Sequence, residues 1–187
     1  MSSSSRLEDY DAVRHYLYGL KHHGAKFGID RMQLLAKRLE HPERSFPVIH
    51  IAGTNGKGSA TSFCRAVMEA QGLSTHVHTS PHLVHWNERY RIGQKGGPGQ
   101  LVEDAAFVDA IRRVAKANDG RAITVFELLT AVMFVLFSEH PADAAIVEVG
   151  LGGRFDATNV IKRPAACLIM PISMDHQAYL GDRVELI

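Results

Sequence analysis

The sequence predicts an α/β fold, with a mostly parallel sheet of the P-loop type and helices on both faces. Four short apolar runs, which we interpret as strands, alternate along the chain with longer segments of helical periodicity. The strands are continuous apolar runs rather than alternating ones, which is typical of strands buried on both faces. A glycine-rich turn with a lysine joins the first strand to a helix, the layout of a phosphate-binding loop. In such folds ligands bind beyond the carboxyl ends of the strands.

Each predicted element follows from its local pattern. Apolar residues at a 3–4 spacing, with helix-ending signals, predict helices over 7–20, 31–40, 60–71, 102–118 and 124–140. Short apolar runs predict strands over 46–52, 144–149 and 165–172, and residues 75–79 are interpreted as a further strand. Asp30 is suited to cap the second helix, and the last helix is apolar over most of its circumference, so we expect it to be buried. The polar segment 87–93 is expected to lead into a flexible loop, 94–100, because this loop combines three glycines with a proline.

The composition excludes several classes of partner. Of the 187 residues, 45% are hydrophobic and 22% charged, which fits one soluble domain with a sizeable core. A net charge of +1 gives no support for a nucleic-acid or membrane-surface partner. No apolar run is long enough for a membrane span, and the first residues lack the apolar core of a signal peptide, so we expect a cytoplasmic protein. Cys64 and Cys167 are interpreted as buried core thiols in a reducing compartment.

Residues 46–59 are predicted to bind phosphate. Glycines let the backbone curl so that N–H groups point inward, and the following helix adds free N–H groups and the positive end of its dipole. Lys57 would supply a charge for β- and γ-phosphate oxygens, and the Ser59 hydroxyl would reach Mg²⁺. The spacing departs from the common G-x-x-x-x-G-K-[S/T] pattern, because Ile51 stands at the first glycine position and the hydroxyl comes two residues after the lysine. The alternative is a plain glycine-rich turn.

Other chemistry-bearing residues lie at the ends of other predicted strands. Glu148 is an acid inside an apolar strand, and a buried carboxylate needs a counter-charge from a metal ion or, alternatively, a structural salt bridge. His176 follows the fourth strand and would ligate a second metal ion or orient a ligand, unless it is a surface loop residue. Ser80 lies on the turn after the second strand and, taken alone, fits a turn or cap residue. His76 and His78 share a strand face but lack a third convergent ligand.

Two further segments are candidate binding loops. Residues 150–159 contain three glycines, a composition typical of a compact binding loop. Within it, Arg154 would hold an anionic group and Phe155 would stack on a planar ring. Residues 124–127 open the apolar helix and would face a ring system. The alternative is an ordinary helix N-terminus at which Glu127 complements the helix dipole.

Taken together, these segments resemble folylpolyglutamate synthase and dihydrofolate synthase, enzymes of the Mur-ligase superfamily. The resemblance covers residues 7–180, about the whole chain. It is carried by five segments in this order: Gly-Thr-Asn-Gly-Lys-Gly-Ser (53–59), Ser-Pro-His-Leu (80–83), Thr-Val-Phe-Glu (124–127), Glu-Val-Gly-Leu-Gly-Gly-Arg-Phe-Asp-Ala-Thr-Asn (148–159) and Met-Asp-His (174–176). The phosphate loop alone would also fit the cell-wall Mur ligases, whereas the 150–159 loop is closer to the folate branch.

The resemblance implies an ATP-dependent amide ligase. The family joins L-glutamate to a dihydropteroate or folate carboxylate through an acyl phosphate. It implies two magnesium sites, one held by Ser80 and Glu148 and the other by Glu148 and His176, with Lys57, Glu148 and His176 as catalytic residues. ATP would be bound by Asn55, Gly56, Lys57, Gly58 and Ser59. The pteridine site would be lined by Lys26, Phe27, Gly28, Thr124, Val125, Phe126, Glu127, Phe155, Asp156 and Ala157.

The resemblance also sets expectations about completeness. Residues 1–6 are expected to be disordered, and 7–187 to form an incomplete Mur-ligase central ATPase domain, truncated before the C-terminal ligase domain. A lysine ligand of the second metal would lie beyond Ile187, so we expect this chain alone to be inactive in ligation. A monomer and a bifunctional enzyme are the preferred expectations. The alternatives are another Mur-family ligase, a P-loop small-molecule kinase, for which the loop spacing is unusual, or a nucleotide-binding module without turnover.

Overall fold

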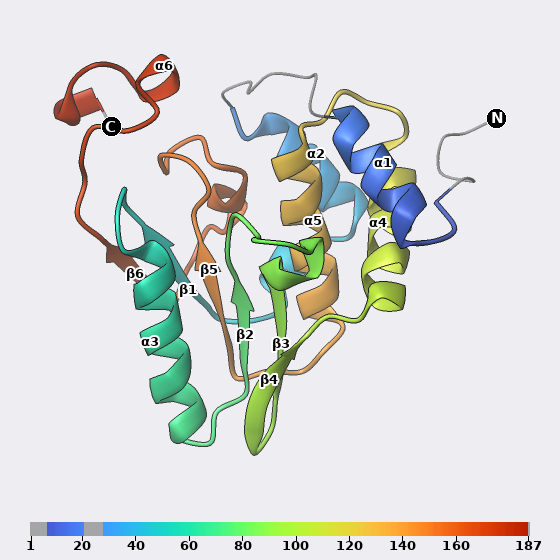
Figure 1. Cartoon of the computed structure of the whole chain (residues 1–187), viewed down its shortest axis with the longest axis horizontal. Helices are drawn as coiled ribbons and strands as arrows, with labels where there is room; N and C mark the ends of the chain where they lie inside the picture. The colour runs from blue at the N-terminus through green and yellow to red at the C-terminus, as the bar shows by residue number, and fades with distance from the viewer. Residues whose placement is uncertain (1–6, 21–27, 187) are drawn as a thin grey trace.

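A six-stranded sheet forms the centre of the computed structural model, which describes residues 7–20 and 28–186 (Figure 1). In space the strands follow the order β4-β3-β2-β5-β1-β6. Their bounds are β1 Val48–Ala52, β2 Thr75–His78, β3 Tyr90–Gln94, β4 Gly97–Leu101, β5 Ala144–Glu148 and β6 Ala166–Ile169. Strands β2, β5, β1 and β6 pair in parallel, and the antiparallel hairpin β3–β4 extends the sheet beyond β2. The predicted mostly parallel sheet is confirmed.

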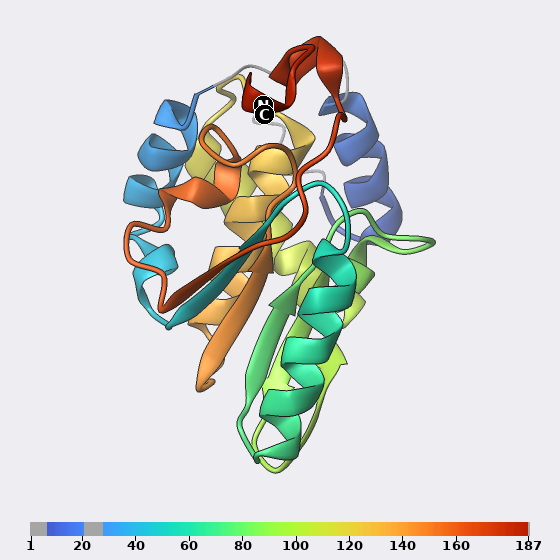
Figure 2. The same cartoon turned by 90° about the vertical axis from the view of Figure 1, so that its left-hand side faces the viewer.

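Helices cover both faces of this sheet (Figures 1 and 2). The helix that follows the phosphate loop, α3, lies on one face, and the other long helices lie on the opposite face. Their bounds are α1 Tyr10–Leu20, α2 Asp30–Arg38, α3 Lys57–Ala70, α4 Asp104–Asn118 and α5 Val125–Ser138, with a short α6 Gln177–Leu180 after β6. Among the described residues, even the apolar α5 lacks the length and hydropathy of a bilayer-spanning helix.

The main hydrophobic core lies between the sheet and α5. Helix α5 is buried without a break over residues 127–137, as its apolar circumference predicts. A smaller core joins α3 to the opposite face of the sheet around Ile51, Val77 and Ile146. Alternate residues of β1 and β5 contribute to the two cores because successive strand side chains point to opposite faces.

The hairpin β3–β4 corrects the prediction of a polar segment and flexible loop. Its glycines mark places where two backbones approach closely rather than loop positions. A Cβ on Gly93 would lie 2.4 Å from the backbone nitrogen of Thr75 on β2. The N–H of Gly99 donates to Glu69 Oε1 on α3 at 3.0 Å. The glycines do mark a special backbone conformation in this segment, but the prediction of a flexible loop was wrong.

Three smaller predictions are also corrected. Asp30 is the first residue of α2 rather than its cap, and the preceding Ile29 makes no side-chain cap hydrogen bond. Helix α3 begins at Lys57, about three residues before the predicted start at residue 60, so the lysine lies in its first turn. Cys167 is exposed and Cys64 is half-buried. The core-thiol interpretation fails for Cys167 because β6 lies at the edge of the described sheet.

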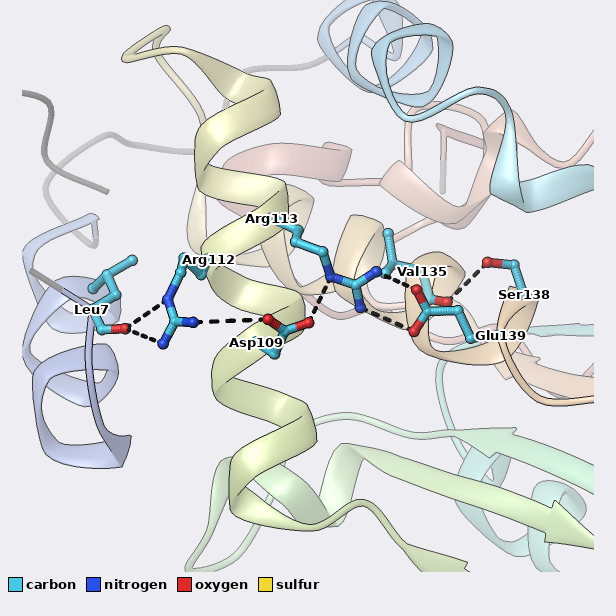
Figure 3. A network of polar contacts seen from close by, with 7 residues as sticks. All are labelled: Leu7, Asp109, Arg112, Arg113, Val135, Ser138 and Glu139. Carbon is cyan, nitrogen blue, oxygen red and sulfur yellow. Dashed lines mark hydrogen bonds and ion pairs between the residues drawn. The ribbon is translucent and has the colours of Figure 1, made fainter. Parts of the chain in front are cut away.

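A polar network ties α4 to its neighbours (Figure 3). Arg113 donates through Nη2 to Glu139 Oε2 at 2.9 Å, and its Nε lies 2.8 Å from Asp109 Oδ2. Arg112 donates through Nε and Nη2 to the Leu7 carbonyl oxygen at 3.1 and 2.9 Å. The hydrogen bond from Arg113 lowers the pKa of the Glu139 carboxyl. These side chains are partly exposed, so each pair contributes at most about 1 kcal/mol to stability.

Candidate active site

The predicted phosphate-binding loop joins β1 to α3, and its backbone requires glycine at two positions. Gly53 has φ 129°, and a Cβ there would lie 2.7 Å from the Met170 carbonyl oxygen. Gly56 has φ 84° and immediately precedes α3. Because α3 begins at Lys57, the N–H groups of its first turn have no acceptor within the helix. Such a helix N-terminus favours bound anions.

The segment after β6 holds this loop in place. The N–H groups of Thr54 and Asn55 donate to the Pro171 carbonyl oxygen at 3.0 and 3.3 Å. The Thr54 hydroxyl donates to the Ser173 carbonyl oxygen and accepts from the Ser173 N–H, each at 3.0 Å. The amides of Thr54 and Asn55 are thus engaged within the protein. The N–H groups best suited to phosphate are consequently those of residues 57–59.

Lys57, Ser80 and Glu148 come together at the carboxyl edge of the sheet, as the sequence predicts. The Lys57 ammonium donates to the carbonyl oxygens of Gly53 and Thr54 at 2.7 and 3.2 Å. Glu148 ends β5 and is 5% exposed. Burial raises the pKa of the Glu148 carboxyl, while the Lys57 charge and a hydrogen bond from the Ser80 backbone oppose the rise. Glu148 is thus a buried carboxylate beside a lysine.

A pocket of about 200 Å³ opens beside this group. The phosphate loop, the glycine-rich loop 150–154 and the segment after β6 form its walls. The lining includes Gly53, Thr54, Lys57, Gly150, Leu151, Gly152, Gly153, Arg154, Asp175 and His176. His176, with φ 48°, is exposed and faces the same pocket as Lys57. No hydrogen bond or ion pair joins His176 to Glu148 among the described residues, so their predicted pairing remains a prediction.

The side chains at this edge of the sheet fit magnesium. Mg²⁺ is usually held by one or two carboxylates together with waters and substrate phosphates rather than by an all-protein cage. Glu148 is such a carboxylate, buried beside a lysine, and the Ser80 hydroxyl and His176 imidazole are further donors. In the part of the chain that the structure describes, no three His, Cys, Asp or Glu side chains are grouped as a metal site. A metal here would therefore depend on phosphate oxygens for part of its coordination.

The loop 150–159 is held from within by Asp156. This buried carboxylate accepts from the N–H groups of Gly150, Leu151 and Thr158 at 3.1, 2.9 and 2.9 Å, and from the Thr158 hydroxyl at 2.5 Å. Burial raises the pKa of Asp156, and these hydrogen bonds oppose the rise. The His50 imidazole on β1 donates through Nε2 to the Thr158 hydroxyl at 2.8 Å. Asp156 thus shapes the loop rather than presenting its carboxylate to the pocket.

Sequence reasoning missed His50 and Thr158. Both lie outside the pocket lining, and His50 is buried in β1, directly before the phosphate loop. The available signal was a polar side chain inside an apolar strand, the same signal that identified Glu148. We describe them as positioning residues, because they connect β1 to the glycine-rich loop.

Residues 124–127 form a helix cap beside that loop. The Thr124 N–H donates to Glu127 Oε2 at 2.8 Å, and Thr124 Oγ1 accepts from the Glu127 N–H at 3.2 Å. Glu127 Oε1 accepts from Arg31 Nε at 2.9 Å, so both carboxylate oxygens are engaged. Glu127 therefore closes the N-terminus of α5, as in the alternative interpretation of this segment as an ordinary helix N-terminus. Phe126 lies against the loop, since a Cβ on Gly150 would lie 2.3 Å from its ring.

The remaining predicted pteridine residues are only partly visible. Lys26 and Phe27 lie outside the described residues, as does the segment 1–6. Gly28 is described and has φ 133°, a conformation that favours glycine. Phe155 is 52% exposed and lies 5.8 Å from the Arg154 guanidinium, whereas Ala157 is buried.

The two strand histidines are structural. His76 Nε2 donates to the His140 carbonyl oxygen at 2.9 Å, and its Nδ1 accepts from the Gly93 N–H at 3.0 Å. His78 Nδ1 donates to the Arg89 carbonyl oxygen at 3.0 Å. Burial and the Arg89 charge lower the pKa of His78 to about 3. Both rings are buried, neutral side chains that hydrogen-bond to the backbone, and neither is arranged as a metal ligand.

Known proteins that are similar in sequence to this chain belong to the family that the motifs resemble. A dihydrofolate synthase/folylpolyglutamate synthase of Bacillus subtilis (strain 168) is 39% identical over 182 residues, which are 95% of this chain and 42% of that protein. The enzyme of the same name from Mycobacterium tuberculosis is 44% identical over 161 residues, covering 82% of this chain and 33% of that protein. This chain is a relative of the folylpolyglutamate and dihydrofolate synthases. No family model matches it.

Solved synthase structures share the fold over nearly the whole chain. Escherichia coli FolC in complex with DHPP and ADP matches with a TM-score of 0.87 at 32% identity, covering 100% of this chain and 43% of that chain. A bifunctional folylpolyglutamate synthase/dihydrofolate synthase with Mn, AMPPNP and L-glutamate bound matches with a TM-score of 0.82, also at 32% identity, over 99% and 43%. The chain thus spans well under half the length of these synthases. The resemblance inferred from the motifs is confirmed, whereas the roles of individual site residues remain predictions.

Replacing Glu148 with glutamine is expected to raise stability and to weaken magnesium-dependent nucleotide binding. A carboxyl whose folded-state pKa is raised destabilises the fold when ionised, and this cost is fully present above the folded-state pKa. Glu148→Gln should therefore raise the melting temperature at neutral pH, with the gain fading as the pH falls through that pKa. Melting curves across pH, with and without Mg-ATP, measure both effects. A variant that is less stable at neutral pH and binds Mg-ATP normally would contradict the assignment.

Lowering the pH is expected to loosen the loop that follows Ser80. Glu88 accepts from the N–H groups of Leu83, Val84 and His85 at 2.7, 2.9 and 2.7 Å, and these bonds lower its pKa to about 2. A depressed carboxyl pKa contributes stability above its ordinary value, and that contribution is lost as the pH falls toward 2. The protection of amides 83–85, measured as their exchange rate relative to the intrinsic rate at each pH, should fall in that range, and exchange should accelerate in Glu88→Gln at neutral pH. Unchanged exchange in the variant would refute this account.

Proposed function

We propose that this chain is the ATP-binding part of an amide ligase that joins L-glutamate to dihydropteroate and to folates. One observation carries the proposal. Lys57, the first residue of α3, lines a pocket of about 200 Å³ opposite a glycine-rich loop, with buried Glu148 beside the lysine. A lysine and a buried carboxylate beside a glycine-rich loop are the groups that phosphoryl-transfer sites use to hold phosphate and a metal ion. The names of the related synthases support the substrate class.

ATP binds with its phosphates against the start of α3. The N–H groups of residues 57–59 and the positive end of the helix dipole meet the phosphate oxygens. Lys57 leaves the loop carbonyls of Gly53 and Thr54 and takes phosphate oxygens as its acceptors, and the Asn55 side chain, which is exposed, adds a contact. Solved synthases titled as complexes with ADP and AMPPNP support this use of the pocket.

Glu148 with the Ser80 hydroxyl would hold one magnesium ion, and Glu148 with His176 would hold a second. When bound, magnesium neutralises phosphate charge and helps align the reacting groups. The raised pKa of Glu148 supports this role, because a buried carboxylate gains most from a nearby cation. The relative solved with Mn, AMPPNP and L-glutamate supports a divalent cation in this family of sites.

The chemistry runs in two steps. A substrate carboxylate oxygen attacks the γ-phosphorus of ATP, the bond to the bridging oxygen of ADP breaks, and an acyl phosphate forms. The glutamate amine then attacks the acyl carbon, inorganic phosphate leaves, and the amine proton passes to solvent. Lys57 stabilises charge on the transferred phosphoryl group, and the walls of the pocket hold the reactants in line. The glycine-rich loop, shaped by Asp156, excludes water from the acyl phosphate.

The pteridine part of the acceptor lies against the loop 150–159 and the start of α5. Phe155 and Phe126 offer ring surfaces there, with Gly28, Val125 and Ala157 nearby in the predicted site. The E. coli relative solved with DHPP supports an acceptor of this class. We propose a bifunctional, monomeric enzyme that accepts both dihydropteroate and folates.

The deciding experiment is acceptor-dependent ADP formation. Because the chain spans well under half of its relatives, it is assayed alone and fused to the remaining part of the B. subtilis relative. The ligase requires both a pteroate or folate and L-glutamate for turnover, a kinase requires one acceptor, and a binding module requires neither and turns nothing over. Turnover in the fusion with a UDP-muramoyl acceptor and not with a pteroate would overturn the assignment to folate.

A further inference from the structure

A second cavity, separate from the phosphate pocket, lies between α3 and the β2–β3 part of the sheet. Its volume is about 160 Å³, well above the ~10–15 Å³ that a single water needs. It is lined by Thr61, Ser62 and Arg65 of α3, and by Val77, Thr79, Glu88, Arg91 and Leu101 from the sheet side. Two arginines and three hydroxyl-bearing residues therefore line one partly open cavity from the helix side and the sheet side.

The hydroxyl of Thr61 marks an unmet hydrogen bond in this cavity. Thr61 is 1% exposed, and its Oγ1 has no hydrogen-bond partner in the described chain. Buried hydroxyls without partners are uncommon in native structures and call for a bound water, ion or ligand. A threonine in a helix often bonds to a carbonyl oxygen of its own preceding turn, which is not the case here.

The two arginines hold positive charge close together across the cavity. Burial lowers the pKa of Arg91, and the charge of Arg65 lowers it further. Arg91 donates through Nη1 to the Gly99 carbonyl oxygen, and Arg65 lies 3.4 Å from Glu69 Oε2 on its own helix. The Glu69 carboxylate therefore has two partners, because its other oxygen accepts from the Gly99 N–H at 3.0 Å.

The one carboxylate in the lining is already engaged. Both oxygens of Glu88 accept backbone N–H groups of residues 83–85, at 2.7 to 2.9 Å. The hydrogen bonds of the Glu88 carboxylate are therefore made to that loop. What the cavity offers a ligand is the remaining donors of Arg65 and Arg91, together with hydroxyl groups. Planar guanidinium donors of this kind match carboxylate and phosphate oxygens.

We propose that this cavity binds an oxyanion group of a small ligand, a carboxylate or a phosphate. The inference does not rest on the proposed ligase function, because none of its residues belongs to the phosphate pocket. It assigns Arg91, Arg65 and the Thr61 hydroxyl as the anion donors.

The test is an NMR titration of this chain with sodium glutarate and, separately, with inorganic phosphate. Sodium chloride at matched ionic strength corrects for salt. Saturable shifts at the backbone amides of Arg91 on β3 and Leu101 on β4 report this cavity and not the phosphate loop. Saturation with only one anion identifies the source as carboxylate or phosphate, and saturation with both identifies the shared chemistry. Shifts that do not saturate with either anion overturn the proposal.

Three variants sharpen the result. Arg91→Gln should weaken binding about tenfold or more, because a charge-assisted bond is lost. Lys116→Gln removes one positive charge from an exposed position on α4 and should leave binding unchanged. Thr61→Val should bind more weakly while melting no lower than wild type, because it removes only an unpartnered hydroxyl. Equal affinity in wild type, Arg91→Gln and Thr61→Val would overturn the assignment of the donors.

Discussion

Lys57→Ala is expected to lower ATP-dependent turnover of a ligation-competent enzyme by about 10²–10³-fold, because it removes a preorganised donor to the transferred phosphoryl group. The fold should persist. Among the described residues, the Lys57 ammonium hydrogen-bonds to two carbonyl oxygens of its own loop, so the loss of stability is about 2 kcal/mol. Turnover is measured with the fusion to the B. subtilis relative, and stability by thermal unfolding of this chain.

Lys95→Ala is the matched control for Lys57→Ala. Lys95 is exposed at the turn between β3 and β4 and takes no part in the pocket. It should leave turnover and stability unchanged. Near-normal turnover in Lys57→Ala, alongside an intact fold, would show that the loop 53–59 does not bind the transferred phosphoryl group.

Gly53→Ala and Gly58→Ala are expected to act in opposite directions on stability. At Gly53, φ is 129° and an added Cβ would meet the Met170 backbone at 2.7 Å, so the variant should lose about 2 kcal/mol or more. At Gly58 the nearest heavy atom to an added Cβ is Glu148 Oε2 at 3.8 Å, an ordinary contact. Because alanine favours a helix, Gly58→Ala should gain up to about 1 kcal/mol.

Nucleotide affinity separates the two substitutions further. Gly58→Ala should bind Mg-ATP less tightly despite its stability, because a methyl group stands where phosphate approaches the first turn of α3. Chemical unfolding and calorimetric titration measure the two quantities independently. If Gly58→Ala bound Mg-ATP as tightly as wild type, the backbone of α3 would not be the phosphate site.

The parallel strands and their helices could be predicted because each carries a complete local signal. Strands β1 and β5 are largely apolar runs, and α5 is apolar over most of its circumference. Glu148 was identified for the same reason, since an acid within an apolar strand is conspicuous. The hairpin β3–β4 was missed because its glycines signal a loop locally, whereas Gly93 and Gly99 serve contacts with β2 and α3.

The finer structure of the site depends on contacts between distant parts of the chain, which no local pattern encodes. The bond between His50 and Thr158 spans 108 positions, and that between Thr54 and Ser173 spans 119. The ion pair of Arg31 with Glu127, 96 positions apart, decided whether that acid faces a ligand or closes a helix cap. Residue types at strand ends therefore predicted which chemistry gathers at this edge, but not which side chains have free atoms.

The central claim is that Mg-ATP binds between the start of α3 and the loop 150–154, and amide hydrogen exchange of this chain with and without Mg-AMPPNP tests it most directly. At 100 times its dissociation constant, a ligand stabilises the binding-competent fold by about 2.7 kcal/mol, enough to slow exchange about a hundredfold where opening requires release. We predict protection concentrated at residues 53–59, 150–154 and 175–176. Saturable binding that protects none of these three segments would contradict the claim.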